Sequence, residues 1–375
     1  MPQTTVLIIG AGPAGLAAAA RLRQEGIPFE ILEQSQHIAH SWRQHYDRLH
    51  LHTVKEHSHL PFMDFPENYP RYVSRRMLVD YFDAYAKKFD IQPHFGEEVA
   101  SIQPGGEEGW EVRTRSAKTF MAPHVVIATG LNRVPNRPGY KGEEHFKGQV
   151  LHSREYKNPR PFSGQKALVV GFGNTGAEIA LDLCENGIPT CLAVRGPVNV
   201  VPRDFLGNPT QKTAFTLAKL PTWLGDWIGA RVQRLAFGDL TPYGLASSDM
   251  PPARQLRETG KTPVIDIGTV DQIKAGKIKV KPGIECFTET GVRFEDGTEE
   301  RFDTVILATG YRALLEDFLP FTDGLFDQYG IPKEVVGAGK YKGLYFLGFD
   351  NYKPGGGLGV IRQDSEVVVK AIAGG

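Results

Sequence analysis

The sequence has little cysteine and no excess of charge of either sign. Its 375 residues include only 3 cysteines, Cys184, Cys191 and Cys286, and these form no C-x-x-C pair and show no metal-ligand spacing. We therefore expect no disulfide framework, zinc site or dithiol redox centre, and a reducing, cytoplasmic setting is favoured. The 43 basic and 43 acidic residues balance, so the electrostatic signature of a nucleic-acid-binding protein is missing.

Long apolar runs are missing as well. No apolar stretch approaches the roughly 20 residues of a membrane-spanning helix, and the N-terminus has no basic segment, so we expect neither a membrane span nor a signal peptide. With 41% hydrophobic residues over 375 positions, the chain can form a core and is long enough for two or three domains.

A strand, a glycine-rich turn and a helix are predicted at the start of the chain. The apolar run Val6-Leu7-Ile8-Ile9 is typical of a buried strand, and Gly10-Ala11-Gly12-Pro13-Ala14-Gly15 follows it with the spacing G-x-G-x-x-G. In this motif the first glycine allows a tight turn, the second lets backbone N–H groups approach a pyrophosphate, and the third lets helix and strand pack closely. The N-terminus of the following helix adds partial positive charge.

The same pattern returns in the middle of the chain, where an apolar run at 167–170 leads into Gly171-Phe172-Gly173-Asn174-Thr175-Gly176. One glycine motif is weak evidence, but two copies with matched flanks indicate two dinucleotide sites. The copies end differently. Glu33 ends the second strand of the first copy, where a carboxylate can bind a ribose 2′-OH, whereas Arg195 takes that place in the second copy. A guanidinium attracts a 2′-phosphate, so we predict NADPH rather than NADH there; a surface arginine in a loop is the alternative.

Two further segments end in the same three residues. Ala128-Thr129-Gly130 and Ala308-Thr309-Gly310 each follow an apolar run of strand type. A strand that ends in small residues suits close passage beside a cofactor and a change of domain. The segment order therefore predicts an α/β protein in which one Rossmann-like dinucleotide-binding domain is interrupted by another.

We expect the first domain to comprise residues 1–160 and 300–375 and the second to comprise 161–299. Within the second domain, residues 213–240 are predicted to form two amphipathic helices split at Pro221. Packing on this domain or on a dimer partner is the favoured interpretation, because the segment has few basic residues for a membrane face. A substrate-channel lid and a shallow membrane contact are the alternatives.

Several segments resemble the flavin-containing monooxygenases, and within them the YUCCA-type branch. The run from Phe146 to Tyr156, F-x-G-x-x-x-H-S-x-x-Y, resembles the signature of this family, and its end at Tyr156 is similar to the N- and S-oxygenating and YUCCA branches rather than the Baeyer–Villiger branch. Further similarity is found at Ser41-Trp42-Arg43, Tyr46-Asp47-Arg48-Leu49, 260–268 and 307–311.

This resemblance implies FAD in the first domain and NADPH in the second. It implies an enzyme in which NADPH reduces FAD, O2 adds to the flavin as a C4a-(hydro)peroxide, and a small organic substrate is oxygenated. Similarity to the YUCCA branch implies a 2-oxo acid such as indole-3-pyruvate, which would lose CO2. A sulfide or amine oxygenase of the same family and an uncoupled, NADPH oxidase-like flavoprotein are the alternatives. A flavin disulfide reductase shares the nested plan but needs a cysteine pair that this sequence lacks.

His52 is the candidate catalytic residue. Many members of the family have an Asn that reaches toward the flavin peroxide three residues before a Lys-Glu pair, and His52 stands in that position before Lys55-Glu56, as in YUCCA-type sequences. The alternative is that His52 only packs or contacts FAD. A metal site at the pairs His50-x-His52 and His57-x-His59 is not expected, because no carboxylate or cysteine signature accompanies them.

The motifs and the resemblance together define the expected cofactor-binding residues. These are Gly10, Gly12, Pro13, Ala14, Gly15, Glu33, Ser41, Trp42, His52, Thr53, Ala128, Thr129, Gly130, Gly171, Gly173, Asn174, Thr175, Gly176, Arg195, Ala308, Thr309, Gly310 and Leu358 at the start of a C-terminal helix. The expected partners are O2 and a small organic substrate, and a homodimer is an open alternative.

Overall fold

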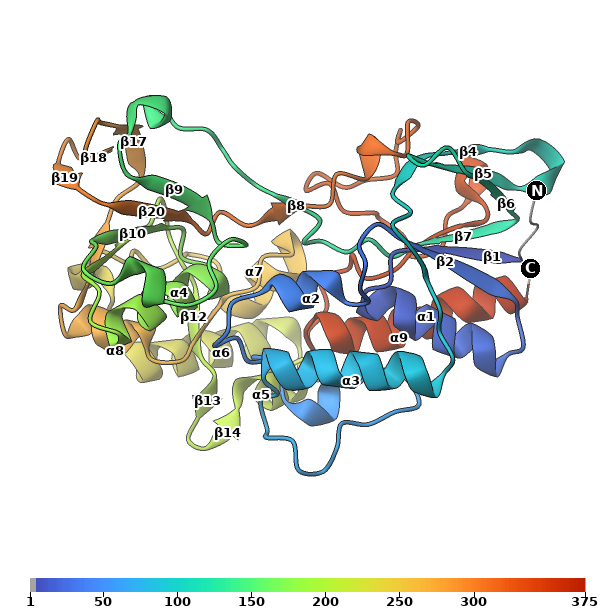
Figure 1. Cartoon of the computed structure of the whole chain (residues 1–375). Coiled ribbons are helices and arrows are strands. Elements are labelled where there is room, and N and C mark those ends of the chain that lie inside the picture. Colours follow the sequence, from blue (N-terminus) through green and yellow to red (C-terminus); the bar gives the residue numbers. More distant parts are fainter. Residues whose placement is uncertain (1–4, 375) are drawn as a thin grey trace. The chain divides into compact units, whose positions relative to one another are not determined.

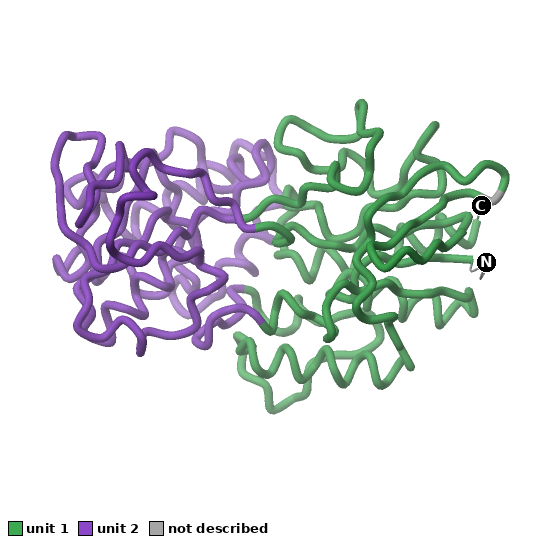
Figure 2. Tube along the Cα trace, turned by 45° about the horizontal axis from the view of Figure 1, so that its top comes forward, with its two compact units in different colours: residues 1–43, 53–134, 311–375 green, residues 44–52, 135–310 purple. Residues whose placement is uncertain are grey.

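The computed structural model describes residues 5–374, which form two compact units (Figure 2). Unit 1 consists of residues 1–43, 53–134 and 311–375, and unit 2 consists of 44–52 and 135–310. These bounds differ from the expected 1–160 and 300–375 against 161–299. The reason is that two strands expected in the first domain, at 149–152 and 304–307, pair within the sheet of unit 2. One precedes and the other follows the second glycine turn in the sequence.

Unit 1 contains a parallel sheet with the strand order β22-β7-β1-β2-β3 (Figure 1). Its strands are β1 (Val6–Ile9), β2 (Phe29–Glu33), β3 (His94–Phe95), β7 (His124–Ile127) and β22 (Leu344–Phe346). Every residue of β1 is apolar and buried, as expected for a central strand covered on both faces. An antiparallel sheet precedes β7 and consists of β4 (Val99–Pro104), β5 (Trp110–Thr114) and β6 (Thr119–Ala122).

Three longer helices belong to unit 1: α1 (Pro13–Gln24), α3 (Arg75–Lys88) and α9 (Gly357–Ala373). The short α2 (His40–Gln44) ends at the first residue of unit 2. Helix α1 begins at a proline, whose fixed φ suits the first turn and whose missing N–H is not needed there. The Arg21 Nε atom of α1 donates to Ser365 Oγ of α9 at 3.0 Å, and the two helices lie side by side (Figure 1).

Unit 2 repeats this plan. Its parallel sheet has the order β16-β11-β10-β20-β9 and consists of β9 (Gln149–His152), β10 (Ala167–Val170), β11 (Thr190–Ala193), β16 (Ile278–Lys281) and β20 (Thr304–Leu307). Helices α4 (Asn174–Glu185) and α8 (Thr269–Lys274) accompany this sheet. An antiparallel sheet of β17 (Ile284–Phe287), β18 (Gly291–Phe294) and β19 (Glu299–Arg301) precedes β20, as β4 to β6 precede β7. The prediction of two nested Rossmann-like domains is confirmed.

The remaining elements of unit 2 follow β11. They are β12 (Val200–Pro202), β13 (Asp204–Phe205), β14 (Asn208–Pro209), α5 (Thr210–Leu217), α6 (Thr222–Phe237), α7 (Pro252–Thr259) and β15 (Val264–Asp266). Two short strands, β8 (Val134–Pro135) and β21 (Tyr311–Arg312), mark the points where the chain passes between units. The 3-10 turns are Lys55–His57, Gly106–Glu108, Glu143–His145, Arg160–Phe162, Thr241–Tyr243, Leu315–Asp317 and Gly339–Tyr341.

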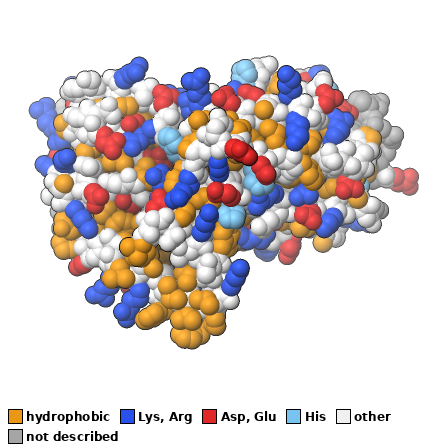
Figure 3. All heavy atoms as spheres, turned by 90° about the horizontal axis from the view of Figure 1, so that it is seen from below, with side chains coloured by type: hydrophobic (Ala, Val, Ile, Leu, Met, Phe, Trp, Pro, Cys, Tyr) orange, Lys and Arg blue, Asp and Glu red, His pale blue; other side chains and the backbone are white. Residues whose placement is uncertain are grey.

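The segment 213–240 forms the two predicted helices, and α6 begins directly after Pro221. Their apolar surface is only partly covered within unit 2. Trp223 and Trp227 are 71% and 54% exposed, and the guanidinium of Arg231 lies 4.9 Å from the centroid of the Trp227 ring. Figure 3 shows hydrophobic side chains gathered on one face of the molecule with Lys and Arg beside them. Packing on unit 2 therefore does not account for these tryptophans.

None of the helices within residues 5–374 combines the length and the apolar content that crossing a bilayer would require.

Candidate dinucleotide sites

The first glycine turn lies between β1 and α1 of unit 1. Gly10 has a φ of +104°, and a Cβ there would lie 2.8 Å from the Ala128 carbonyl oxygen. A Cβ at Gly15 would lie 2.0 Å from the Gly10 carbonyl oxygen, so helix and strand are too close for any side chain. At Gly12 a Cβ would meet no described atom within 4 Å. The first and third glycines are thus required by the fold, while the second faces space that a pyrophosphate can occupy.

The carboxylate of Glu33 holds this turn in place. Its Oε2 accepts the Ala11 N–H and its Oε1 accepts the Ser35 N–H, both at 2.8 Å, and the residue is 7% exposed. A carboxylate has about four acceptor positions. Glu33 can therefore keep both backbone bonds and still accept a hydrogen bond from a ribose hydroxyl at the end of β2.

The segment that carries Ser41 and Trp42 also contacts the first turn. The Ala39 N–H donates to the Ala11 carbonyl at 2.9 Å, and the Trp42 N–H donates to the Ala39 carbonyl at 3.0 Å. The Trp42 ring lies 6.2 Å from that of Phe82, centroid to centroid. These contacts place the start of α2 beside the first glycine turn within unit 1.

Thr129 and the start of α9 complete the first site. The Thr129 Oγ1 atom is buried and has no hydrogen-bond partner among the described residues, which leaves it free to bind a ligand. A Cβ at Gly356 would lie 2.6 Å from the Thr53 side chain, so Thr53 and the first turn of α9, which includes Leu358, are neighbours. Since Gly130 has a φ of +75°, the chain turns sharply after Thr129.

The second glycine turn, in unit 2, has nearly the same geometry. Gly171 has a φ of +105°, and a Cβ there would lie 2.7 Å from the Ala308 carbonyl oxygen. A Cβ at Gly176 would lie 1.9 Å from the Gly171 carbonyl oxygen, and at Gly173 it would meet no described atom within 4 Å. The Asn174 Oδ1 atom accepts the Ile265 N–H at 2.7 Å and so connects the start of α4 to β15.

Arg195 lies just beyond β11 and is exposed. Within residues 5–374 its guanidinium forms no ion pair, and its positive charge acts on the nearby Tyr140. Burial raises the pKa of the Tyr140 hydroxyl, and the charge of Arg195 partly offsets this effect. A guanidinium that faces solvent at the end of the second strand is available for a phosphate.

The Ala308-Thr309-Gly310 segment of unit 2 is fastened by Asn136. The Thr309 Oγ1 atom donates to the Asn136 carbonyl at 2.5 Å, the Asn136 Nδ2 atom donates to the Thr309 carbonyl at 3.2 Å, and the Asn136 N–H donates to the Gly310 carbonyl at 2.9 Å. Sequence reasoning missed Asn136, since nothing local marks it as the partner of a strand end more than 170 positions away.

His52 belongs to unit 2, whereas its neighbour Thr53 belongs to unit 1. The His52 Nε2 atom lies 2.7 Å from Oε1 of Glu178, a residue of α4 that is 1% exposed. Sequence reasoning missed Glu178. A signal was present, because Glu178 and Asp182 interrupt the apolar run of α4 one helical turn apart, which is unusual for a buried helix face.

The residues of the family signature are structural parts of unit 2. The Tyr156 hydroxyl is fully buried and donates to Asp182 Oδ2 at 2.7 Å, and burial raises the pKa of both groups. A Cβ at Gly148 would lie 2.5 Å from the Asp303 carbonyl oxygen. The His152 Nε2 atom lies 3.0 Å from the Gly310 carbonyl, and burial lowers the pKa of this imidazole. The signature therefore supports the frame of the second site.

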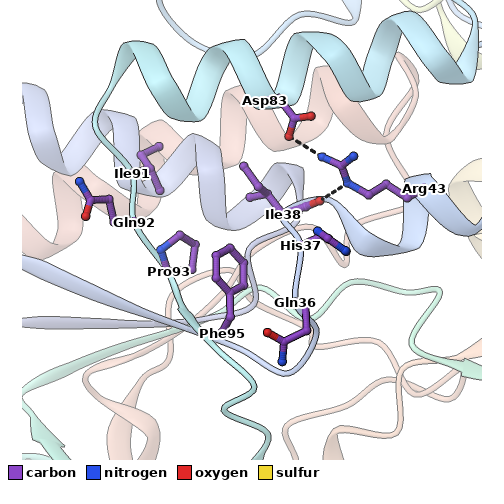
Figure 4. A pocket seen from close by; sticks show the side chains of 9 residues that line it. All are labelled: Gln36, His37, Ile38, Arg43, Asp83, Ile91, Gln92, Pro93 and Phe95. Carbon is purple, nitrogen blue, oxygen red and sulfur yellow. Dashed lines mark hydrogen bonds and ion pairs between the residues drawn. The ribbon is translucent and has the colours of Figure 1, made fainter.

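A separate pocket of about 700 Å³ lies in unit 1 (Figure 4). It is lined by Gln36, His37, Ile38, Arg43, Asp83, Ile91, Gln92, Pro93 and Phe95. Figure 4 shows the Arg43 guanidinium directed at Asp83 and at the Ile38 carbonyl, so its charge is already paired. None of the expected cofactor-binding residues lines this pocket.

Each unit thus presents a strand, a glycine turn and a helix N-terminus whose second glycine faces open space. The residues present fit a pair of dinucleotides, and Thr129 adds an unpartnered buried hydroxyl to the first site. No cluster of three or more His, Cys, Asp or Glu side chains suited to a metal ion occurs within residues 5–374. The fold and the two sites define a protein with two nested dinucleotide-binding domains.

Comparison with known proteins identifies the family. The family model described as Flavin-binding monooxygenase-like matches residues 3–325. Indole-3-pyruvate monooxygenase YUCCA1 of Oryza sativa subsp. japonica is 42% identical over 349 residues, which cover 92% of this chain and 86% of that protein. Probable indole-3-pyruvate monooxygenase YUCCA9 of Arabidopsis thaliana is 40% identical over 354 residues, which cover 92% and 83%. The chain belongs to the flavin-binding monooxygenase-like family.

Solved structures share its fold. The flavin-containing monooxygenase from Stenotrophomonas maltophilia superposes with a TM-score of 0.76 at 23% identity, covering 100% of this chain and 99% of the other. An oxidised steroid monooxygenase bound to NADP gives a TM-score of 0.73 at 18% identity, covering 99% and 85%. The resemblance inferred from the sequence is confirmed: the chain is an FAD-containing, NADPH-dependent flavin monooxygenase.

Proposed function

We propose that the enzyme oxidatively decarboxylates a 2-oxo acid and that indole-3-pyruvate is its substrate. The observation that carries this proposal is the identity of about 40% with indole-3-pyruvate monooxygenases over nearly the whole chain. The overall reaction balances as 2-oxo acid plus O2, NADPH and H⁺ giving the carboxylic acid one carbon shorter, CO2, NADP⁺ and water. With indole-3-pyruvate the organic product would be indole-3-acetate.

FAD is assigned to unit 1. The Gly10-to-Gly15 turn and the N-terminus of α1 would bind its pyrophosphate, and Glu33 would accept the ribose hydroxyl while it keeps its two backbone bonds. Thr129 would donate its unpartnered hydroxyl. The first turn of α9, with Leu358 and the neighbouring Thr53, would present backbone N–H groups to the flavin ring. The bound flavin supplies the redox and oxygen chemistry.

NADPH is assigned to unit 2. The turn from Gly171 to Gly176 and the N-terminus of α4 would bind its pyrophosphate. The exposed Arg195 would form charge-assisted hydrogen bonds to the 2′-phosphate, which NADH lacks. His52 would act beside the flavin, where the family resemblance puts it, and Glu178 would fix the orientation of its ring.

The test is a product balance with purified holoenzyme. We expect indole-3-pyruvate to yield indole-3-acetate and CO2 in amounts close to the NADPH consumed. The variant His52→Gln should shift NADPH consumption toward H2O2, whereas His50→Gln, on an exposed neighbour whose ring contacts the Arg48 carbonyl, should not.

Other outcomes would select the alternatives. Full coupling with a thioether or a tertiary amine and no turnover of indole-3-pyruvate would show a sulfide or amine oxygenase. Equal amounts of NADPH consumed and H2O2 formed with every substrate would show an NADPH oxidase-like flavoprotein.

A cytoplasmic location is part of the proposal. It is supported by Cys184, Cys191 and Cys286, which are all free thiols as expected in a reducing compartment. A homodimer stays a prediction. Substitutions of the exposed Trp223 and Trp227 of α6 would test whether this surface forms the dimer contact.

A further inference from the structure

The segment 44–52 is bound to unit 2 by contacts along its whole length. The Asp47 N–H donates to the Lys157 carbonyl at 2.8 Å, and the Arg48 Nη1 atom lies 2.8 Å from Glu185 Oε2 and 3.3 Å from Asp182 Oδ1. His52 then contacts Glu178. The three carboxylates lie on α4, four and three positions apart, which places them on one face of the helix. The segment therefore runs along the acidic face of the helix that begins at the second glycine turn.

A continuous chain of polar contacts crosses this face. The Thr175 hydroxyl, in the glycine turn, donates to the Tyr46 hydroxyl, which in turn donates to the Glu178 carboxylate. The same carboxylate lies 2.7 Å from the His52 Nε2 atom. Tyr46 is 2% exposed and Glu178 1%, so the chain is shielded from water along its centre.

Because Glu178 is buried, it depends on these contacts. A carboxylate in a dry environment is stable only when hydrogen bonds or an opposite charge compensate for its lost hydration. The described groups around Glu178 are the Tyr46 hydroxyl and the His52 imidazole, and Arg48 is the positive charge that acts on Tyr46. If one contact is removed, the remaining groups must compensate for the lost hydration of the Glu178 carboxylate. A change in the Thr175 hydrogen bond therefore alters the contact between Glu178 and His52.

We propose that Tyr46 and Glu178 are positioning residues that couple occupancy of the second dinucleotide site to the placement of His52. This rests on the proposed function, since it takes NADP(H) as the ligand of unit 2. Thr175 lies in the turn assigned to the pyrophosphate. Its hydroxyl can therefore donate either to a phosphate oxygen or to the Tyr46 hydroxyl. A bound dinucleotide then sets the Thr175 hydroxyl, and through Tyr46 and Glu178 it sets the order of 44–52.

Coupling of this kind is reciprocal. If bound NADP⁺ orders the segment, then loosening the segment must weaken NADP⁺ binding by the same factor. The coupling can therefore be measured without turnover, which separates it from the identity of the organic substrate.

The experiment follows hydrogen exchange of peptides that cover 44–52 and 171–176 in the oxidised holoenzyme, with and without NADP⁺, together with the Kd of NADP⁺ from calorimetry. The variants are Tyr46→Phe, which removes one hydroxyl, and Glu178→Gln, which removes the charge. Glu185→Gln is the matched control, because Glu185 contacts the same segment from the same helix but its side chain is 49% exposed.

In the wild type we expect NADP⁺ to slow exchange in both peptides. In Tyr46→Phe and Glu178→Gln the protection of 171–176 should persist, that of 44–52 should be lost, and the Kd should rise roughly five- to tenfold, at the lower end of the usual range of coupling between sites. The control should match the wild type within twofold. The double variant should be no worse than the stronger single one, because both act in one chain of contacts.

Two results would overturn the proposal: protection of 44–52 that persists in Tyr46→Phe, or effects of the two variants that simply add. A Glu178→Gln protein that fails to fold leaves the decision to Tyr46→Phe. If NADP⁺ fails to protect 171–176 in the wild type, it is the cofactor assignment of unit 2 that fails, and the coupling falls with it. If protection is normal but indole-3-pyruvate is not turned over, only the proposed substrate is lost.

Discussion

The two glycine turns have the same backbone geometry but different surroundings. Gly10 and Gly171 differ by 1° in φ, and the hypothetical Cβ contacts at the third glycines differ by 0.1 Å (2.0 and 1.9 Å). At the end of the next strand, however, Glu33 is buried and bound to its own turn, while Arg195 is exposed and unpaired among the described residues. We therefore propose that the turn provides a general pyrophosphate site and that the residue beyond it selects the nucleotide.

The strand ends beside the turns differ too. Thr129 in unit 1 keeps a buried hydroxyl without a partner in the described chain, whereas Thr309 in unit 2 donates its hydroxyl to Asn136. The Thr129 hydroxyl is therefore left for a ligand to satisfy, whereas the Thr309 hydroxyl is satisfied within the protein. This difference suits a resident cofactor in unit 1 and an exchangeable one in unit 2.

The largest effect should come from alanine at the third glycine of each turn. Gly15→Ala and Gly176→Ala force a Cβ against a carbonyl oxygen, at a cost of about 1–3 kcal/mol or more. We expect Gly15→Ala to purify without flavin, and Gly176→Ala to keep its flavin but bind NADP⁺ at least tenfold more weakly, as measured by flavin absorbance and calorimetry. Gly12→Ala and Gly173→Ala, which have free space, should lose ligand affinity at unchanged Tm of the ligand-free protein. Loss of flavin in Gly176→Ala would contradict the separation of the two sites.

Glu33→Gln should have the next largest effect. The amide can accept one backbone N–H but turns its own NH2 toward the other, so a buried donor is left unsatisfied at a cost of about 1–3 kcal/mol. We expect a lower Tm and a lower flavin content. Glu30→Gln on the same strand, whose carboxylate contacts the exposed His94, is the control and should change neither. Normal flavin content in Glu33→Gln would show that the carboxylate serves the turn but does not bind the cofactor.

Arg195→Ala should alter nucleotide choice with little effect on stability. Since the guanidinium is exposed and unpaired in the described structure, we expect the free energy of unfolding to stay within about 0.5 kcal/mol. The KM for NADPH should rise about tenfold or more, as loss of a charge-assisted bond predicts, while that for NADH changes little. Arg293→Ala, on an exposed pair with Glu299, is the control. An equal rise for both nucleotides would rule out a 2′-phosphate contact.

The smallest effect should distinguish the two threonines. Thr309→Val removes a hydrogen bond and should lower the free energy of unfolding by about 1 kcal/mol in urea titrations of the flavin-free protein. Thr129→Val removes a hydroxyl without a described partner, so the flavin-free protein should keep or gain stability. Its flavin should dissociate more readily. A loss of stability in flavin-free Thr129→Val would mean that the hydroxyl is already satisfied.

The local parts of this architecture could be predicted from the sequence. The roles of Gly10 and Gly15, or of Gly171 and Gly176, follow from spacing within one strand–turn–helix unit, and Glu33 follows from the end of the next strand. Glu178 and Asn136 could not be predicted, because their importance arises from partners that only the folded chain brings close. The bounds of the two units differ from the expected ones for a related reason: a parallel strand such as β9 takes its neighbour from a remote segment, and only the sheet order assigns it.

His52 illustrates the limit most clearly. It is adjacent to Thr53 in sequence, and the resemblance assigns both to the flavin. In the structure, however, the chain passes between units at this bond, and the contacts of His52 within unit 2 are with α4. Neither spacing nor hydropathy marks such a crossing point.

The interrupted course of unit 1 has a consequence for how the protein is made. All of unit 2, including the segment 44–52, has been synthesised by residue 310, but unit 1 still lacks β22 and α9. The hydrogen bond from Arg21 to Ser365 cannot form until Ser365, 344 residues further along the chain, has been synthesised. At about 5–20 residues per second this takes roughly 20–70 s of translation. During that interval the apolar face of α1 that packs on α9 in the complete protein is exposed on the ribosome. We therefore expect chaperones to bind the incomplete unit 1 rather than unit 2.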